Sequence, residues 1–386
     1  MSHIKKYAPR RRFEKFSNAD DWEQRKLEDI LDARSGRDYK HLDSGDIPVY
    51  GTGGYMLSVG EALSYEEDAI GIGRKGTIDK PYILKAPFWT VDTLFYTVPK
   101  RDSDLNFIHS IFQKINWKSK DESTGVPSLS KTTINAVSVF TPSCSEQKEI
   151  GTFFNKLDDT IALHQRKLEK IKALKTAYLS EMFPAEGETK PKRRFAGFTD
   201  DWEQCELGEE SDVRDGTHDS PKYFDDGYPL VTSKNLKDFG LDLSDVSLIS
   251  DKDFRSINKR SKVDIGDILF GMIGTIGNPV QIDRDDFAIK NVALIKEQKK
   301  ILNSFLIQVL KSQVFNRYIR NENAGGTQKF LSLSKVRGFR FLCPNNEEQI
   351  RIGNFFKQID ETITLHQRKL QKLQNIKKAY LNEMFI

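Results

Sequence analysis

The amino-acid sequence predicts an α/β protein with a pseudo-two-fold tandem duplication, in which two globular α/β domains are joined by two long antiparallel coiled-coil helices. Three observations lead to this fold class. A segment at 146–183 recurs without a gap at 348–385, and more than half of the aligned positions are identical. Apolar residues in both copies alternate steps of four and three, the spacing of a coiled-coil seam. The regions before each copy hold short apolar runs between glycine and proline turns, as mixed α/β domains do.

The repeat extends beyond the long segment. The hexapeptide LHQRKL occurs at 163–168 and at 365–370. Upstream, RRFEKFSNADDWEQRKL resembles RRFAGFTDDWEQCEL, and the main difference is the insertion of Asn18 and Ala19. Weaker similarities lie between these copies, where IGRKGTI resembles GMIGTIG and PSLSKTTINAVSVFTP resembles FLSLSKVRGFRFLCP. A duplicated frame with diverged middle regions is the simplest explanation.

These repeats divide the chain into six parts. They are a basic amino-terminal segment at 1–19, a first domain at 20–145, a first helix at 146–183, a linker leading into the second domain at 184–201, a second domain at 202–345 and a second helix at 346–386. Neither helix contains an internal proline, and glycine occurs only near each start. At about 1.5 Å per residue each helix spans roughly 50 Å, which suits a spacer between domains.

The predicted seam has an apolar or semi-polar residue at each step. Its members are Phe154, Leu157, Ile161, His164, Leu168 and Ile171 in the first copy, and Phe356, Ile359, Ile363, His366, Leu370 and Leu373 in the second. Lys175 and Lys377 interrupt both seams at the same step. We interpret the two histidines as register-setting polar residues, because no cluster with metal-ligand spacing accompanies either one. The alternative is that each apolar stripe packs onto its own domain.

The composition is that of a globular protein, with 38% hydrophobic and 30% charged residues. No apolar run approaches the length of a membrane span and the amino terminus lacks the apolar core of a signal peptide, so we expect a cytoplasmic protein without membrane contact. Cys144, Cys205 and Cys343 are few and scattered, which favours reduced thiols. A net charge of +4 is compatible with a polyanionic partner but does not require one.

Catalytic signatures are mostly missing from the sequence. GIGRKG at 71–76 fits the dinucleotide pattern G-x-G-x-x-G, but a proline and no helical periodicity follow it, so a loop between strands is the better interpretation. No glycine-lysine pair of a P-loop, no proline-aspartate pair and no G-x-S-x-G elbow occur, and Asn278–Pro279 continues to Val280. The sequence therefore predicts no catalysis, no cofactor and no metal in this chain.

The two diverged regions contain predicted strands and helices. The strands are expected at 47–50, 69–72 and 88–98, and the helices at 106–117 and 304–320. Loops rich in glycine, hydroxyl and basic residues lie between them. Such loops suit a nucleic-acid surface, because glycine lets the backbone approach phosphates, Ser and Thr donate to phosphate oxygens, and Arg, Lys, Asn and Gln read base edges. Each loop taken alone is better explained as an ordinary turn, and it is their recurrence at matching places in both halves that favours a nucleic-acid surface.

Candidate DNA-contacting residues come from these loops. In the first domain they are Arg34, Ser35, Gly36, Arg37, Thr52, Gly53, Gly54, Arg74, Lys75, Gly76, Thr77, Thr124 and Gly125. In the second domain they are Arg214, Gly216, Thr217, His218, Thr232, Ser233, Lys234, Asn235, Gly274, Thr275, Gly325, Gly326, Thr327 and Gln328. Arg74 and Lys75 are the cations to test first.

The chain resembles the specificity subunits of type I restriction-modification systems over essentially its whole length. The resemblance rests on the DDWEQ-x-x-L segments, the L-S-K…P…EQ closures, and the helices with I-G-x-F-F…D-x-T-I…LHQRKL…AYL-x-EMF. It implies two target recognition domains that each read one half of an asymmetric bipartite DNA sequence, with the helices setting the gap. It also implies two methyltransferase subunits that use S-adenosylmethionine, and two motor-nuclease subunits that use ATP and Mg.

Two other functions remain as alternatives. A coiled-coil protein-interaction adaptor would show no DNA affinity, whereas phosphate contacts require strong salt dependence. An enzyme that used GIGRKG as a cofactor loop would bind S-adenosylmethionine or a nucleotide by itself. The sequence does not disclose which bases are read.

Overall fold

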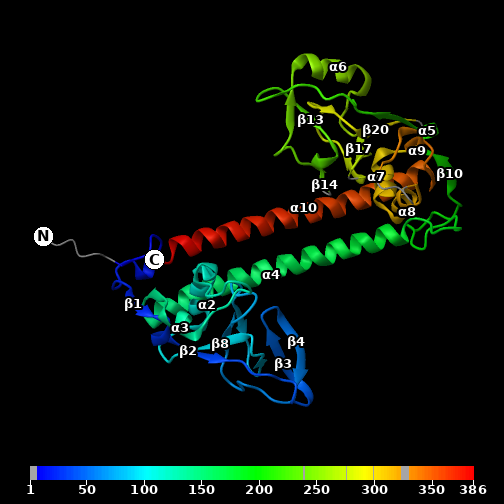
Figure 1. Cartoon of the computed structure of the whole chain (residues 1–386). Coiled ribbons are helices and arrows are strands. Elements are labelled where there is room, and N and C mark those ends of the chain that lie inside the picture. Colours follow the sequence, from blue (N-terminus) through cyan, green and yellow to red (C-terminus); the bar gives the residue numbers. More distant parts are fainter. Residues whose placement is uncertain (1–6, 238–239, 275, 299, 323–329) are drawn as a thin grey trace. The chain divides into compact units, whose positions relative to one another are not determined.

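The computed structural model describes residues 7–237, 240–274, 276–298, 300–322 and 330–386. The chain forms two compact units, unit 1 with Met1–Gln165 and Lys369–Ile386, and unit 2 with Arg166–Arg368. Each unit is described by itself. Helix α4 (Cys144–Glu181) begins in unit 1 and ends in unit 2, and helix α10 (Asn346–Glu383) does the reverse (Figure 1). None of the described helices combines the length and apolarity that a membrane span needs.

Unit 1 contains an antiparallel sheet of order β2-β8-β5-β6 and a smaller sheet of order β4-β3-β7, in which β3 and β7 are parallel. Strand β1 pairs with β9, which directly precedes α4. The elements are β1 (Glu23–Lys26), α1 (Leu27–Ile30), β2 (Leu31–Ser35), β3 (Ser44–Gly51), β4 (Gly54–Val59), β5 (Ala69–Gly73), β6 (Tyr82–Leu84), β7 (Trp89–Thr90), β8 (Leu94–Pro99), α2 (Leu105–Lys114), α3 (Lys131–Ala136) and β9 (Ser138–Thr141).

Unit 2 repeats the four-stranded sheet, in the order β11-β20-β17-β18. Its second sheet has the order β12-β16-β13-β19, with β13 and β19 parallel, so β12 is added to the three-stranded arrangement of unit 1. Its elements are β10 (Glu203–Glu206), α5 (Leu207–Glu210), β11 (Ser211–Asp215), β12 (Tyr223–Phe224), β13 (Tyr228–Val231), β14 (Leu236–Lys237), β15 (Gly240–Leu241), β16 (Ser247–Ile249), α6 (Asp251–Ser261), β17 (Ile268–Gly271), β18 (Gly277–Gln281), β19 (Ala288–Ile289), β20 (Val292–Glu297), α7 (Asn303–Lys311), α8 (Gln313–Glu322), α9 (Leu333–Arg337) and β21 (Arg340–Cys343). The duplication therefore extends through the regions whose sequences diverged.

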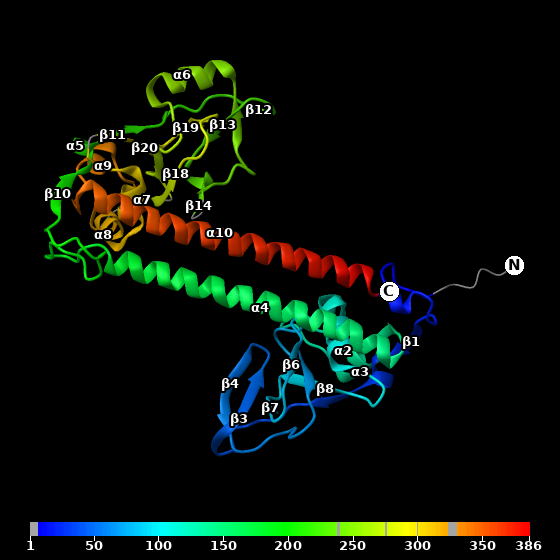
Figure 2. The ribbon, with the colours of Figure 1, turned by 180° about the vertical axis from the view of Figure 1, so that it is seen from behind.

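Helix α2 lies between the four-stranded sheet of unit 1 and the first half of α4, as both views show (Figures 1 and 2). Asp104 caps this helix by accepting from the amide of Phe107. A Cβ on Gly151 of α4 would lie 2.3 Å from an Asp104 carboxylate oxygen, so the glycine of the repeated I-G-x-F-F motif lets the two helices approach. In unit 2, Gly353 has the same role, since its Cβ would lie 2.7 Å from Oγ of Ser304.

Within each unit the start of one long helix packs antiparallel to the end of the other. In unit 1 the rings of Phe153 and Tyr380 are 5.1 Å apart and Asp158 pairs with Lys377. In unit 2 the rings of Tyr178 and Phe355 are also 5.1 Å apart. There Lys175 pairs with Asp360 at 2.5 Å. The lysines that interrupt the predicted seams are therefore half-buried ion-pair partners of the opposing helix.

The other residues predicted for the seam are all buried or half-buried in their units. His164 and His366 are half-buried. Among the described residues, no group of His, Cys, Asp and Glu could hold a metal ion. The function of the seam as a continuous coiled coil stays a prediction.

A buried ion pair fastens the segment before each domain to the start of a long helix. Arg12 pairs with Glu146 in unit 1, and Arg194 pairs with Glu348 in unit 2. Beside each lies an exposed pair, Arg11 with Glu383 and Arg193 with Glu181. The exposed pair of unit 2, Arg193 with Glu181, joins residues that are close in sequence. The equivalent pair of unit 1, Arg11 with Glu383, joins residues that are far apart in sequence.

Two predicted elements are interrupted. The helix expected at 304–320 is two helices, α7 and α8, because the Ser312 side chain accepts from the amide of Val314 and starts a new helix. The strand expected at 88–98 is divided into β7 and β8, and the amide of Leu94 donates to the carbonyl of Val91 in the turn between them. The stretch at 71–76, predicted as a loop, is a loop only in part, because 71–73 belong to β5; strand β6 follows it, without a helix between them.

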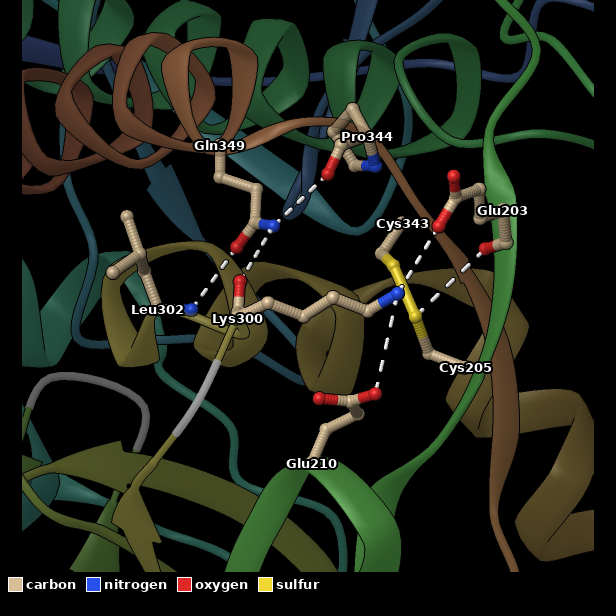
Figure 3. The surroundings of a disulfide bond; sticks show 8 residues. All are labelled: Glu203, Cys205, Glu210, Lys300, Leu302, Cys343, Pro344 and Gln349. Atoms are coloured by element: carbon tan, nitrogen blue, oxygen red, sulfur yellow. Dashed lines mark hydrogen bonds and ion pairs between the residues drawn. A yellow bond between two sulfur atoms is a disulfide. The ribbon is translucent and has the colours of Figure 1, made fainter.

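The prediction of reduced thiols is wrong for two of the three cysteines. Cys205 of β10 and Cys343 of β21 form a disulfide with a Cα–Cα distance of 6.5 Å, whereas Cys144 is free (Figure 3). The antiparallel register places Glu203 opposite Cys343, so Cys205 and Cys343 are diagonal neighbours on adjacent strands. Strand pairing brings them together across 138 residues of sequence, which spacing alone does not reveal.

Candidate nucleic-acid interface

Two loops of unit 1 meet at the end of strand β5. Lys75 and Ser128 form an isolated antiparallel bridge. The amide of Leu129 donates to the carbonyl of Arg74 at 2.9 Å, and the amide of Gly76 donates to the carbonyl of Pro127 at 2.8 Å. These bonds join the loop that begins at 74–76, directly after β5, to the loop at 121–130, although the two are distant in sequence.

The junction borders an open cavity of about 830 Å³, lined by Ser35, Arg74, Lys75, Phe95, Thr124 and Lys131 among others. Asp121 shapes the second loop by accepting from the amides of Ser123 and Ser128. These hydrogen bonds lower the pKa of the Asp121 carboxyl, and the bond from Ser128 has the largest effect. The carboxyl therefore stays ionised as an acceptor. Five predicted residues thus lie around one cavity, namely Ser35, Arg74, Lys75, Thr124 and Gly125.

The cations of this cavity differ in how they are neutralised. The Arg74 guanidinium lies 5.9 Å over the Phe95 ring and donates to the carbonyl of Asp92. In the part of the chain that the structure describes, Lys75 and Lys131 take part in no ion pair. By contrast, Arg34 pairs with Asp32 and Glu67. The hydrogen bond to Glu67, then that to Asp32, raises the pKa of the Arg34 guanidinium.

The other candidates of unit 1 lie close by or have a structural role. Thr52 lies at the tip of the β3–β4 hairpin and beside Gly76, since a Cβ on Gly76 would be 3.7 Å from Oγ1 of Thr52. Gly53 and Gly54 belong to this turn, and Thr77 follows Gly76 as a half-buried residue. Gly36 is buried, and its Cβ would lie 2.0 Å from the carbonyl oxygen of Val91, so it serves chain packing. Arg37 is exposed.

In unit 2 most predicted cations are held by carboxylates. Arg214 pairs with Asp212, and Lys234 pairs with Asp245. His218 lies between Asn291 and Asp215, at 2.8 Å from each side-chain oxygen. These contacts, Asn291 first, raise the pKa of the His218 imidazole.

The remaining candidates of unit 2 mainly stabilise the fold or lie near the loop after β17. Gly216 packs closely, since its Cβ would lie 2.4 Å from the carbonyl oxygen of Ile289. Thr217 is half-buried beside it, while Thr232 and Asn235 form a capping box. Ser233 donates to the carbonyl of Ile273, and Gly274 follows with φ +73°. Thr275, Gly325, Gly326, Thr327 and Gln328 lie outside the described residues.

Unit 2 has a junction equivalent to that of unit 1. Ile273 and Phe330 form an isolated antiparallel bridge, and the amide of Leu331 donates to the carbonyl of Met272 at 2.9 Å. Lys131, Ser128 and Phe330 were not predicted from the sequence. The available signal was their position in or just before the L-S-K motifs, since Ser130 of the first motif caps α3 and Ser332, just before the second motif, caps α9.

Comparisons with known proteins agree with the duplicated architecture. The family model described as type I restriction modification DNA specificity domain matches residues 19–173 and 199–375. The type I restriction enzyme MjaVIII specificity subunit of Methanocaldococcus jannaschii is 23% identical over 292 residues, covering 72% of this chain and 68% of that protein. The putative type I restriction enzyme MjaX specificity subunit of the same organism is 23% identical over 282 residues, covering 71% of this chain and 63% of that protein.

A solved structure has the same fold. The crystal structure of the type I restriction-modification system S subunit from M. genitalium superimposes with a TM-score of 0.73 at 14% identity, covering 98% of this chain and 99% of the other. The two segments matched by the family model each contain one domain and most of the long helix that follows it. The chain belongs to the family of type I restriction-modification DNA specificity proteins.

Proposed function

We propose that this chain is the non-catalytic DNA-recognition subunit of a type I restriction-modification complex, and that each domain reads one half of an asymmetric bipartite target. One observation carries the proposal: two domains of the same topology present the same two-loop junction with different side chains. A shared scaffold with different chemistry at its rim suits the reading of two different half-sites by one chain.

The first half-site is assigned to the cavity of unit 1. Arg74, Lys75 and Lys131 supply positive charge there, while Thr124 and neighbouring serines supply hydroxyl donors. Cations without carboxylate partners are the groups that phosphates attract, and hydroxyl groups can donate to phosphate oxygens or bases. Contact of the candidate residues with double-stranded DNA remains part of this proposal.

We assign the chemistry to partner subunits in the cytoplasm. Two methyltransferase subunits with S-adenosylmethionine and two motor-nuclease subunits with ATP and Mg complete the complex. The repeated helices support two equivalent docking positions, because α4 and α10 are identical at more than half of their aligned positions and pair antiparallel within each unit. An antiparallel pair of matched helices also suits a spacer that sets the gap between the half-sites.

Mapping methylated adenines in a host that carries this chain and its methyltransferase partner tests the proposal. The expected result is one bipartite motif with a fixed unspecified gap, lost when this chain is deleted. Methylation that persists in the deletion strain, or a chain–partner complex that binds DNA without salt dependence, would contradict it and favour the protein-interaction adaptor.

Replacing Arg74, Lys75 and Lys131 together by Gln should weaken DNA binding mainly through phosphate contacts. Each lost contact lowers the slope of log affinity against log salt by about 0.9, so three lost contacts lower it by about 2 to 3. Fluorescence anisotropy with the mapped target over a salt series measures this slope.

The matched control replaces Lys26, Lys85 and Lys118 by Gln. These exposed lysines of unit 1 pair with Glu28, Asp68 and Asp79. Both triple variants replace three cations by Gln, so they change the net charge equally. We expect the slope of the control to stay near that of the parent chain. Equal slopes for the two triple variants would remove the cavity from the interface.

A further inference from the structure

The two domains carry opposite chemistry at one equivalent position. In each, a residue after a central strand, β5 or β17, is bridged to the residue two positions before a capping serine. In unit 1 this pair is Lys75 with Ser128, and in unit 2 it is Ile273 with Phe330. In both units the amide of the residue after the second bridge partner donates to the carbonyl of the residue before the first, at 2.9 Å, so the two junctions have the same register.

The pair in unit 2 is apolar and faces solvent. Phe330 is 49% exposed and Ile273 is 37% exposed, whereas the neighbouring Met272 and Leu331 are buried in the core. Ser233 donates to the carbonyl of Ile273, so the backbone under the pair is held in place. Apolar side chains fixed at an exposed junction lower the free energy of the system when another surface covers them.

We infer that Phe330, with Ile273 beside it, makes an apolar contact with the bases of the second half-site, at the position where Lys75 meets phosphate in the first. This inference rests on the proposed function. Phosphate oxygens offer no favourable contact to a phenyl ring, while thymine methyl groups and the faces of an opened base step do. Lys234, next to the Ser233 that bonds Ile273, already pairs with Asp245, so the apolar contact distinguishes this domain.

The test uses the full chain with its methyltransferase partner and the mapped target. Phe330→Ala should weaken binding about tenfold or more without changing the salt slope, since contact between a base and an aromatic ring neutralises no phosphate. Phe330→Leu, which keeps an apolar side chain, should lose less. Lys75→Ala is the matched variant of unit 1, and it should lower the salt slope.

Scrambling each half-site shows where the effect lies. With the second half-site scrambled, Phe330→Ala and the parent should bind alike, while scrambling the first should leave their difference intact. Uracil in place of thymine in the second half-site separates a methyl contact, which it weakens, from insertion into a base step, which it does not. Either result supports the apolar contact.

Two outcomes overturn the inference while leaving the proposed function standing. One is a parent complex that binds its target while Phe330→Ala binds equally well. The other is a Phe330→Ala variant whose loss appears only as a lower salt slope. A parent complex with no preference for its mapped target contradicts both the inference and the proposed function. Equal thermal unfolding of variant and parent shows that the half-exposed ring is not needed for folding.

Discussion

Replacing Glu348 by Ala should lower the free energy of unfolding by about 3–5 kcal/mol, because it leaves a buried arginine without its counter-ion. Arg194 donates to both carboxylate oxygens of Glu348, at 2.7 Å and 2.8 Å, and the two side chains are only 12% and 1% exposed. Urea denaturation followed by circular dichroism measures this loss, because the first unfolding transition of the variant should occur at a lower urea concentration than that of the parent chain.

The neighbouring pair supplies the control. Arg193 and Glu181 are 55% and 40% exposed, so removal of their ion pair by Glu181→Ala should cost about 0–1 kcal/mol. Glu348→Gln keeps hydrogen-bond acceptors without the charge and should lie between the two alanine variants. A Glu181→Ala loss as large as that of Glu348→Ala would show that burial does not determine the strength of these pairs.

The sequence was informative where a long periodic pattern or an exact repeat constrained the chain. Helix α4 begins two residues before its predicted start and α10 begins at its predicted start, and Ser143 and Asn345 accept from the amides of Glu146 and Glu348. The break at Ser312 was not predictable, because no glycine or proline marks it and only the packing of α7 and α8 reveals it. The cystine likewise depends on a long-range strand pairing.

The candidate interface was predictable in part. Arg74, Lys75 and Thr124 come from loops that the sequence singled out, and the structure brings them around one cavity. Lys131 and Phe330 were missed because their positions depend on bridges between distant segments. Gly36 and Gly216 were selected as loop glycines that let the backbone approach phosphates, yet a neighbouring carbonyl leaves no space for a Cβ, so packing explains their residue type.

A backbone hydrogen bond closes the linker between α4 and the second domain, and unit 1 has an equivalent bond. The amide of Arg11 donates to the carbonyl of Glu383, just as the amide of Arg193 donates to the carbonyl of Glu181 in unit 2. The linker between Glu181 and Arg193 is therefore a loop with its ends tied together. Residues inserted there extend the loop rather than the helix, so the helices themselves are the place to test the spacer.

Inserting the same number of heptads into α4 after Gln165 and into α10 after Gln367 should lengthen the gap of the methylated motif and leave both half-sites unchanged. One heptad adds about 10 Å to each helix, or about three base pairs at 3.4 Å each. Equal insertions keep Asp158 opposite Lys377 and Lys175 opposite Asp360. Methylome mapping of the variants reads the gap directly.

The phase of the duplex adds a second expectation. Three base pairs rotate one half-site by about 100° against the other, because B-DNA turns once in about 10.5 base pairs, whereas a heptad rotates the helix by only about 20° from its starting phase. Three heptads add about nine base pairs, close to a full turn, so that variant should methylate its target more completely than the one-heptad variant does. Insertion into α4 alone should abolish methylation, since both inter-helix ion pairs cannot then form together. An unchanged gap in the equal-insertion variants would show that the helices do not measure it.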